Sequence, residues 1–329
     1  MDLPAACRVF VSVGERATFT LGAAAASVPQ SVASRRIAAL EKHLGVHLFD
    51  RTTRRAALTP FGQDLGIDPE VEFPVSSLAK VPLALAVAER IEVGSLDPAA
   101  IIQVPPGQSS SPGPSGPSRF RHPAWIAVED LLRLCVSATD NAAADALFAL
   151  VPPAEVNRMV QDAGVTGISI RHVMKDLLET PVERFAPEEV HLAHSLAIGS
   201  WTSGRGHPVR QLDVRRANSG TARAFVDLLA GLWNPVKVSE GAAARVRSLM
   251  GNNMIRHRLA PDLASDSAKW SSKTGTPLNP RHEVGVVEHD DGGMIAVAAL
   301  TESTVPAAIQ PAAEAMMGRV ARALHDQIR

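Results

Sequence analysis

The chain has 329 residues and a formal net charge of −1, with 46% hydrophobic and 20% charged residues. This composition is typical of a globular protein with a substantial core, and the length favours two or more domains. Because the sequence contains no tyrosine, mechanisms that require a phenol are excluded. No apolar run reaches the roughly 18 residues needed to cross a membrane, and no signal peptide is visible. The sequence therefore predicts a cytoplasmic protein with no membrane partner.

Charge is distributed unevenly along the chain. Residues 1–63 hold eight basic and four acidic residues, so this head has a net charge of +4 and the remainder has −5. A basic head on an acidic body indicates that only the head meets a polyanion. The two cysteines, Cys7 and Cys135, fall in different predicted domains, which argues against a disulfide framework.

The head is predicted to contain a helix, a tight turn and a second helix within residues 15–43. Thr18 or Thr20 can cap the first helix, residues 27–29 form the turn, and Gln30–His43 form the second helix. Its outward face offers an amide, hydroxyls and a guanidinium, which suit base edges and phosphates, and two short strands across residues 48–58 flank a basic loop. The predicted DNA-binding residues are Gln30, Ser31, Ser34, Arg35 and Arg54.

This segment resembles the winged helix-turn-helix of LysR-type transcriptional regulators. The resemblance rests on Phe19, Thr20, Ala23, Ala24, Val28, Gln30, Ser34, Arg35, Ile37, Leu40, Glu41, Leu44, Gly45, Val46, Leu48, Phe49, Arg51, Thr52, Leu58, Thr59 and Gly62. It implies a domain over residues 1–63 whose partner is double-stranded DNA. LysR regulators continue into a dimerising helix and an effector domain, and neither follows here. A three-helix packing unit with solvated arginines is the alternative.

The rest of the chain, residues 64–329, is predicted to be one domain. Residues 64–76 are a connector, an apolar helix starts at Ser77, and the Pro-, Gly- and Ser-rich stretch 104–119 is predicted to be a surface loop without helix or strand. Further predicted helices cover residues 123–136, 142–150, 154–163, 222–233, 241–249 and 307–328, residues 164–221 show no clear periodicity, and predicted strands cover 270–276, 283–288 and 294–301. Asp290 to Gly293 is a hairpin turn between the last two strands. Helices with an antiparallel sheet near the end predict an α+β domain.

Three short motifs in this domain suggest nucleophilic acyl transfer. Ser77 and Lys80 are three residues apart on the predicted helix, so a buried Lys80 with a lowered pKa can take the proton of Ser77. Thr139 and Asn141 lie between two predicted helices. Thr139 can pass a proton to a leaving nitrogen, and Asn141 can hold a substrate amide. On a predicted strand, Lys273 supplies a cation for a substrate carboxylate. Singly, such motifs are usually solvated helix faces, caps or turns, whereas their joint occurrence in this order favours catalysis.

The strand motif continues with Thr274, Gly275 and Thr276, which are predicted to line the substrate site. The N–H groups of Ser77 and Thr276 could form an oxyanion hole. The chemistry needs no cofactor and no metal ion, and the predicted partner is a β-lactam or a related small amide or ester.

The trio of motifs resembles the serine β-lactamases and penicillin-binding proteins, class A above all, from about Phe73 to Arg329. Three departures stand out. Thr139 replaces the usual serine. The Glu-x-x-Leu-Asn string that supplies the deacylation base is missing, with only Asp176 and Glu179 as weak candidates. Few residues precede the nucleophile, so the usual five-stranded sheet is predicted to shrink to three strands, which leaves an open edge that invites a homodimer.

Three functions are compatible with these features. The first is a β-lactamase-like serine hydrolase that forms an acyl-enzyme through Ser77 and Lys80. The second is a transcriptional regulator whose β-lactamase-like domain senses a ligand. The third is an inert fusion of two gene fragments.

Overall fold

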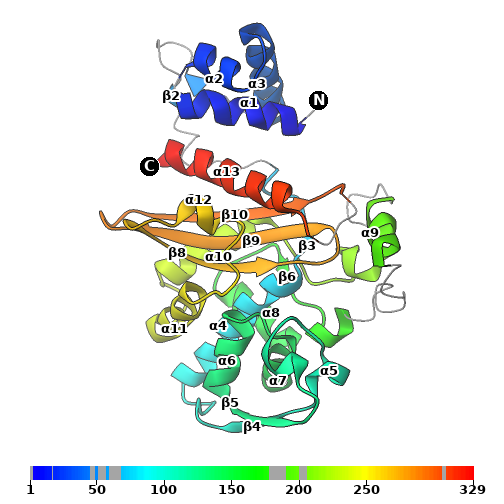
Figure 1. Ribbon diagram of the computed structural model, residues 1–329. Helices are drawn as coiled ribbons and strands as arrows, with labels where there is room; N and C mark the ends of the chain where they lie inside the picture. The colour runs from blue at the N-terminus through cyan, green and yellow to red at the C-terminus, as the bar shows by residue number, and fades with distance from the viewer. Residues whose placement is uncertain are drawn as a thin grey trace. The chain divides into compact units, whose positions relative to one another are not determined.

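The computed structural model describes the chain at residues 3–16, 18–44, 49–50, 57–58, 68–177, 190–199, 206–305 and 309–329. It divides into two compact units (Figure 1). The first contains Met1–Pro69, Arg258–Leu263 and Glu314–Arg329, and the second contains Glu70–His257 and Ala264–Ala313. No helix within the described ranges is both long and apolar enough to cross a membrane.

The first unit contains the predicted helix-turn-helix. Its elements are α1 (Leu3–Arg16), α2 (Phe19–Ala25), α3 (Gln30–Leu44), β1 (Phe49–Asp50) and β2 (Ala57–Leu58). The side chain of Thr18 caps α2 by accepting a hydrogen bond from the Leu21 N–H at 3.3 Å. Phe10 and Val13 of α1 pack with Ile37 of α3 in a small apolar core. The two predicted helices and the two predicted short strands are confirmed, and the strands pair antiparallel.

Two further helices of the first unit come from late in the sequence, α12 (Ala260–Leu263) and α13 (Pro311–Ile328), which begins in the second unit. Arg258, just before α12, forms a buried ion pair with Glu314 of α13 at 3.0 Å. Arg322 of α13 donates a hydrogen bond to the carbonyl of Asp262 at 3.1 Å. These contacts tie α12 to α13.

A three-stranded antiparallel sheet dominates the second unit. Its strands are β8 (Ala268–Gly275), β9 (Pro280–His289) and β10 (Met294–Glu302), in the order β10-β9-β8. The three predicted strands and the hairpin between the last two are confirmed. Nearly every residue of β9 is buried, whereas β10, at one edge, is half-exposed along most of its length. Within the described residues no further strand pairs with β10.

The helices of this unit within the described residues are α4 (Lys80–Glu92), α5 (Gly107–Ser110), α6 (Val128–Val136), α7 (Asn141–Leu150), α8 (Pro153–Asp162), α9 (Val190–Gly199), α10 (Ala222–Trp233) and α11 (Glu240–Gly251). Most of them lie below the sheet in Figure 1, whereas α9 lies to its right. α10 packs on β9 and β10, α11 packs on β8, and α4 packs against α6, α7, α8 and α11. The first nine residues of α4 are all buried, because this helix is the centre of the core.

Short elements complete the second unit. The two-residue strands β3 (Phe73–Pro74), β6 (Ile168–Ser169) and β7 (Ser219–Gly220) form a small sheet, and β4 (Ile101–Val104) pairs with β5 (Ala124–Ala127). The 3₁₀ turns are η2 (Ser76–Ala79), η3 (Gly116–Arg119), η4 (Met174–Leu177) and η7 (Arg210–Leu212).

Two local predictions are wrong. The helix expected to start at Pro123 starts at Val128, because residues 124–127 form β5 and pair with β4. The stretch 104–119, expected to lack regular structure, contains the short α5 and η3. In both places the stabilising partners are distant in sequence or the elements are only four residues long, so local patterns do not reveal them.

Candidate active site

The predicted nucleophile lies on the 3₁₀ turn η2, directly before the helix that carries the predicted base. Ser77 is half-buried, and Lys80 is the first residue of α4. Lys80 Nζ donates to Ser77 Oγ at 3.2 Å, so the three-residue spacing brings the two groups together as expected. The residue before the nucleophile, Ser76, has a φ of 49°, which is a strained conformation for a residue with a side chain.

The amine of Lys80 is completely buried and fully engaged. Besides Ser77, Nζ donates to the Thr139 carbonyl and to Asn141 Oδ1, both at 2.8 Å. Burial lowers the pKa of Lys80 from 10.5 to about 8, although Cys135, Asp140 and Asp145 oppose this shift. A lysine with this pKa is neutral in a useful fraction of molecules near neutral pH, which a proton acceptor requires.

A tight turn between α6 and α7 presents Thr139, Asp140 and Asn141. Thr139 adopts a φ of 61°, a left-handed conformation that is costly for a β-branched residue. Asp140 caps α7 by accepting a hydrogen bond from the Ala143 N–H at 2.7 Å, and its second oxygen accepts from the Ser118 N–H at 2.8 Å. The fully buried carboxylate therefore holds the turn from both sides.

Asn141 connects the base to the stretch 104–119. Its Oδ1 accepts from Lys80, and its Nδ2 donates to the Pro112 carbonyl at 2.8 Å. One hydrogen of the amide predicted to hold a substrate is thus already engaged. Ser118 Oγ accepts from the N–H groups of Asn141 and Ala142, both at 2.9 Å. The Pro-, Gly- and Ser-rich stretch therefore holds the turn that carries Thr139 and Asn141, a role that its composition did not reveal.

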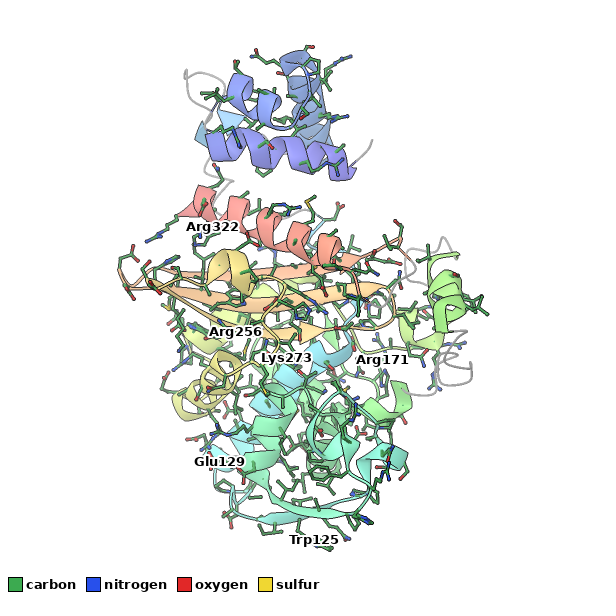
Figure 2. All side chains as sticks on the ribbon, in the orientation of Figure 1. Trp125, Glu129, Arg171, Arg256, Lys273 and Arg322 are labelled. Atoms are coloured by element: carbon green, nitrogen blue, oxygen red, sulfur yellow. The ribbon has the colours of Figure 1, made fainter. Side chains whose placement is uncertain are left out.

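Lys273 lies on β8, between the sheet and the helices below it (Figure 2). Its buried Nζ donates to Thr139 Oγ1 at 2.8 Å and to the Thr274 carbonyl at 2.9 Å. Thr274 and Gly275 complete the strand, and Thr276 follows it and is exposed. All five predicted catalytic residues, Ser77, Lys80, Thr139, Asn141 and Lys273, are thus joined by hydrogen bonds in one site.

Asp145 is a residue of this site that the sequence motifs did not indicate. Its carboxylate accepts hydrogen bonds from Ser111 Oγ and from the N–H groups of Met174 and Lys175, at 2.6 and 2.9 Å for the two backbone groups. Burial raises its pKa, while these hydrogen bonds oppose the rise. Asp145 lies four residues after Asn141 on α7, so helical spacing could have suggested a shared face.

The turn that Asp145 binds, η4, contacts the nucleophile turn η2. Asp176, one weak candidate for a deacylation base, lies on η4 and is exposed. Glu179, the other, lies outside the described residues. Asp176 is therefore the candidate that remains, on a turn that contacts η2.

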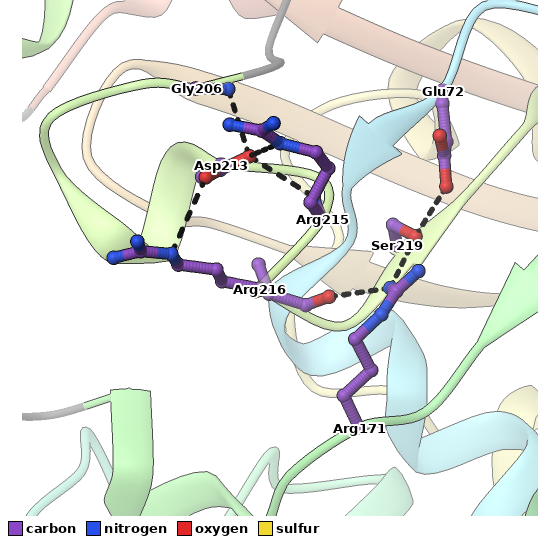
Figure 3. Close-up of polar contacts among 8 residues, drawn as sticks. Glu72, Arg171, Gly206, Asp213, Arg215, Arg216 and Ser219 are labelled. Atoms are coloured by element: carbon purple, nitrogen blue, oxygen red, sulfur yellow. Dashed lines mark hydrogen bonds and ion pairs between the residues drawn. The ribbon is translucent and has the colours of Figure 1, made fainter.

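Arg171, just before η4, is joined to β7 and the residues before it by polar contacts (Figure 3). Arg171 donates to the Ala217 carbonyl at 2.7 Å and to Ser219 Oγ at 2.8 Å. Ser219 Oγ in turn donates to Glu72 Oε1 at 2.7 Å. Because Arg171 lies three residues before η4, these contacts help to keep η4 beside Ser77.

The head presents most of its predicted DNA-binding residues to solvent. Gln30, Ser31 and Arg35 of α3 are exposed, and Ser34 is half-buried. Arg35 Nε donates to the Ser31 carbonyl at 3.4 Å, so its side chain lies along the helix. Arg54 lies outside the described residues.

Neither a cysteine nucleophile nor a metal site is supported by the described residues. Cys135 is buried in α6, and burial raises the pKa of its thiol to about 12, which removes it as a nucleophile. No group of three His, Cys, Asp or Glu side chains in the described part of the chain is arranged to hold a metal ion.

The fold and this arrangement define a LysR-type helix-turn-helix joined to a β-lactamase-like α+β domain. The chain belongs to the Beta-lactamase enzyme family, whose family model matches residues 41–328. The model of the bacterial regulatory helix-turn-helix proteins of the lysR family matches residues 5–63, which confirms the resemblance of the head.

The chain is also similar to individual regulatory proteins and to solved β-lactamase structures. The chain is 58% identical over 279 residues to the "Beta-lactamase regulatory protein BlaB" of Streptomyces cacaoi, covering 82% of this chain and 89% of that protein. It is 31% identical over 278 residues to the "HTH-type transcriptional regulator BlaA" of the same organism, covering 82% and 69%. A β-lactamase structure from Chitinophaga pinensis superposes with a TM-score of 0.61 at 21% identity, covering 80% of this chain and 87% of that one, which supports the fold.

Proposed function

We propose that this protein is a transcriptional regulator that senses a β-lactam or a related small amide or ester by becoming acylated on Ser77. Residues 1–63 bind DNA in this proposal, and residues 64–329 react with the ligand. The observation that carries it is the contact between Ser77 Oγ and the buried, pKa-lowered amine of Lys80.

In the proposed acylation step, groups of this site accept, pass on and donate the protons that move. Neutral Lys80 accepts the proton of Ser77, and Ser77 Oγ forms a bond to the ligand's carbonyl carbon. The carbonyl–nitrogen bond then breaks, and the leaving nitrogen takes a proton through the Thr139 hydroxyl, which Lys273 orients by donating to its oxygen. The N–H groups of Ser77 and Thr276 stabilise the oxyanion in this mechanism.

Two considerations favour a sensor over an efficient hydrolase. Hydrolysis of the acyl-enzyme needs a base that activates water, and the Glu-x-x-Leu-Asn string that supplies this base in class A enzymes does not occur in the sequence. The relative that is 58% identical bears the name of a regulatory protein. A β-lactamase-like hydrolase that uses Asp176 as its base is the second candidate function.

Mass spectrometry of the intact protein after mixing with benzylpenicillin tests the proposal. We expect a mass increase equal to that of the penicillin, located on Ser77, absent in Ser77→Ala and persisting for hours. An adduct that disappears within minutes, with released penicilloate, would establish the hydrolase instead. No adduct with penicillins, cephalosporins or simple activated esters would refute acylation of Ser77.

DNA binding by the head is tested separately, with DNA fragments from around the gene in a gel-shift assay. Arg35→Ala should weaken binding by about 5–100-fold, the range for a lost base-edge contact, or lower the salt dependence by about one counterion if Arg35 contacts phosphate. Arg133→Ala, which removes an exposed arginine of α6 in the second unit, is the matched control and should bind like the unmodified protein. Equal affinity of all three proteins would contradict the prediction that Arg35 of α3 contacts DNA.

A further inference from the structure

His282 is a fully buried histidine that no motif of the site includes. It lies on β9 directly opposite Gly275 of β8, so it is the cross-strand neighbour of the residue that precedes Thr276. Its Nε2 lies 3.0 Å from the Pro74 carbonyl, and its Nδ1 accepts a hydrogen bond from the Thr301 N–H at 3.2 Å. Since a carbonyl only accepts, Nε2 must carry the proton, and the ring is neutral.

The Pro74 carbonyl belongs to the segment that leads into the nucleophile. Pro74 lies three residues before Ser77, and the ring of Phe73 packs edge-on against the His282 ring, with centroids 5.8 Å apart. One imidazole thus connects the segment that leads into η2 with the β8–β9 pair, whose strand β8 ends one residue before Thr276.

The two segments also touch directly at Gly275. A Cβ at this position would come within 2.7 Å of the Val75 carbonyl and 3.1 Å of Leu78 Cγ, so only glycine permits the approach. The contact at Gly275 sets how near the segments can come, and the hydrogen bond from His282 keeps them there. Between Pro74 and Ser77 lies the strained Ser76, whose conformation needs such support from its surroundings.

We propose that His282 is a positioning residue that fixes the separation of the Ser77 and Thr276 N–H groups, the two donors of the oxyanion hole. This inference rests on the proposed acylation of Ser77 and extends it to the residue that aligns the site. The donors belong to different segments, η2 and the end of β8, and His282 joins those segments by a side-chain hydrogen bond. A donor displaced by about 1 Å no longer matches the developing oxyanion, although the ligand can still bind.

Two substitutions of similar polarity separate positioning from packing. In His282→Gln the amide nitrogen reaches about as far as Nε2 and can still donate to the Pro74 carbonyl. In His282→Asn the amide reaches only the place of Nδ1, so this hydrogen bond is lost. His289→Asn is the matched control, because His289 is a buried histidine on the same strand that pairs with Ala268 at the far end of β8.

The experiment measures the binding constant and the acylation rate constant of each full-length variant by stopped-flow with a chromogenic cephalosporin, together with the midpoint of thermal unfolding. We expect His282→Asn to lower the acylation rate constant by about 10–100-fold, with the binding constant changed less than about threefold. His282→Gln should stay within about fivefold of the unmodified protein, and His289→Asn should match it. Equal rates for Asn and Gln, or rates that simply follow the thermal midpoints, would overturn the proposal.

Labelling of Ser77 by a fluorophosphonate distinguishes this inference from the proposed function. The reagent needs only the activated serine and the oxyanion hole, since Ser77 Oγ attacks phosphorus and fluoride leaves. If the cephalosporin fails to acylate the protein but the fluorophosphonate labels it, and His282→Asn slows that labelling where His282→Gln does not, the positioning role stands without the β-lactam. If neither reagent modifies the unmodified protein, both proposals fail.

Discussion

Lys80→Met is expected to slow the acylation of Ser77 by about 10²–10⁴-fold, the usual contribution of a general base. Lys80 Nζ lies within hydrogen-bonding distance of Ser77 Oγ, at 3.2 Å. Methionine has a similar length and no basic nitrogen, so it fills the space without accepting a proton. Adduct formation with benzylpenicillin, followed by mass spectrometry over time, measures the effect.

The pH dependence of acylation identifies the reason for this loss. Since only neutral Lys80 can accept the Ser77 proton, the rate should rise with pH and level off above about 8, the lowered pKa of this lysine. Lys269→Met is the control, because this lysine is largely exposed on β8 and pairs with Glu288; its pH profile should be unchanged. A rate that is independent of pH between 6 and 9, or that survives in Lys80→Met, would contradict the role of Lys80 as base.

The same burial makes stability depend on pH. In the unfolded chain Lys80 has its ordinary pKa of 10.5, whereas in the folded protein the value is about 8. Between these two values the unfolded state binds more protons than the folded state, so this group's contribution to the free energy of unfolding increases as pH rises through that window. Near neutral pH the burial of Lys80 therefore lowers the free energy of unfolding.

Part of the proposed acylation site could be predicted from the sequence, because the spacing of its groups is local. Ser77 and Lys80 are three residues apart, across η2 and the first residue of α4, and Lys273 lies on β8, which pairs with the next strand along the chain. The strands and α10 were predicted well for the same reason. Periodicity and turn residues within a short window determine them.

The groups that hold the site in place depend on contacts between distant segments. Ser118 meets Asp140 and Asn141 from a stretch whose composition indicates only a loop. The left-handed Thr139 is not signalled by its residue type, since threonine disfavours that conformation. His282 aligns with Pro74 across 208 residues of sequence. No local pattern carries this information, because each partner is chosen by the fold.

Asp140→Ala is the second substitution with a large expected effect, and it acts on both stability and acylation. The carboxylate is fully buried and accepts from two backbone N–H groups, those of Ala143 and Ser118. Its removal deletes the cap of α7, which is worth about 1 kcal/mol. It also leaves the Ser118 N–H buried without a partner, which costs about 1–3 kcal/mol. We expect the free energy of unfolding of the second unit to fall by about 2–4 kcal/mol, as measured by urea denaturation.

Asp140→Asn refines this prediction. An asparagine side chain has one acceptor oxygen where aspartate has two, so it can satisfy either the Ala143 or the Ser118 N–H but not both. Its loss of stability should therefore fall between those of the alanine variant and the unmodified protein. Asp130→Ala, which removes an exposed carboxylate near the start of α6, is the matched control and should change stability by less than about 0.5 kcal/mol.

Acylation distinguishes a weakened turn from a changed charge. Asp140 raises the pKa of Lys80, so removal of its charge should move the midpoint of the pH–rate profile below about 8 in both Asp140→Ala and Asp140→Asn. The alanine variant should in addition acylate more slowly at every pH, because the Thr139 carbonyl that binds Lys80 sits on the turn that Asp140 supports. If the midpoint stayed near 8 while stability fell, the carboxylate would act only as a helix cap. If both variants matched Asp130→Ala, the two hydrogen bonds of Asp140 would contribute nothing to the turn that presents Thr139 and Asn141.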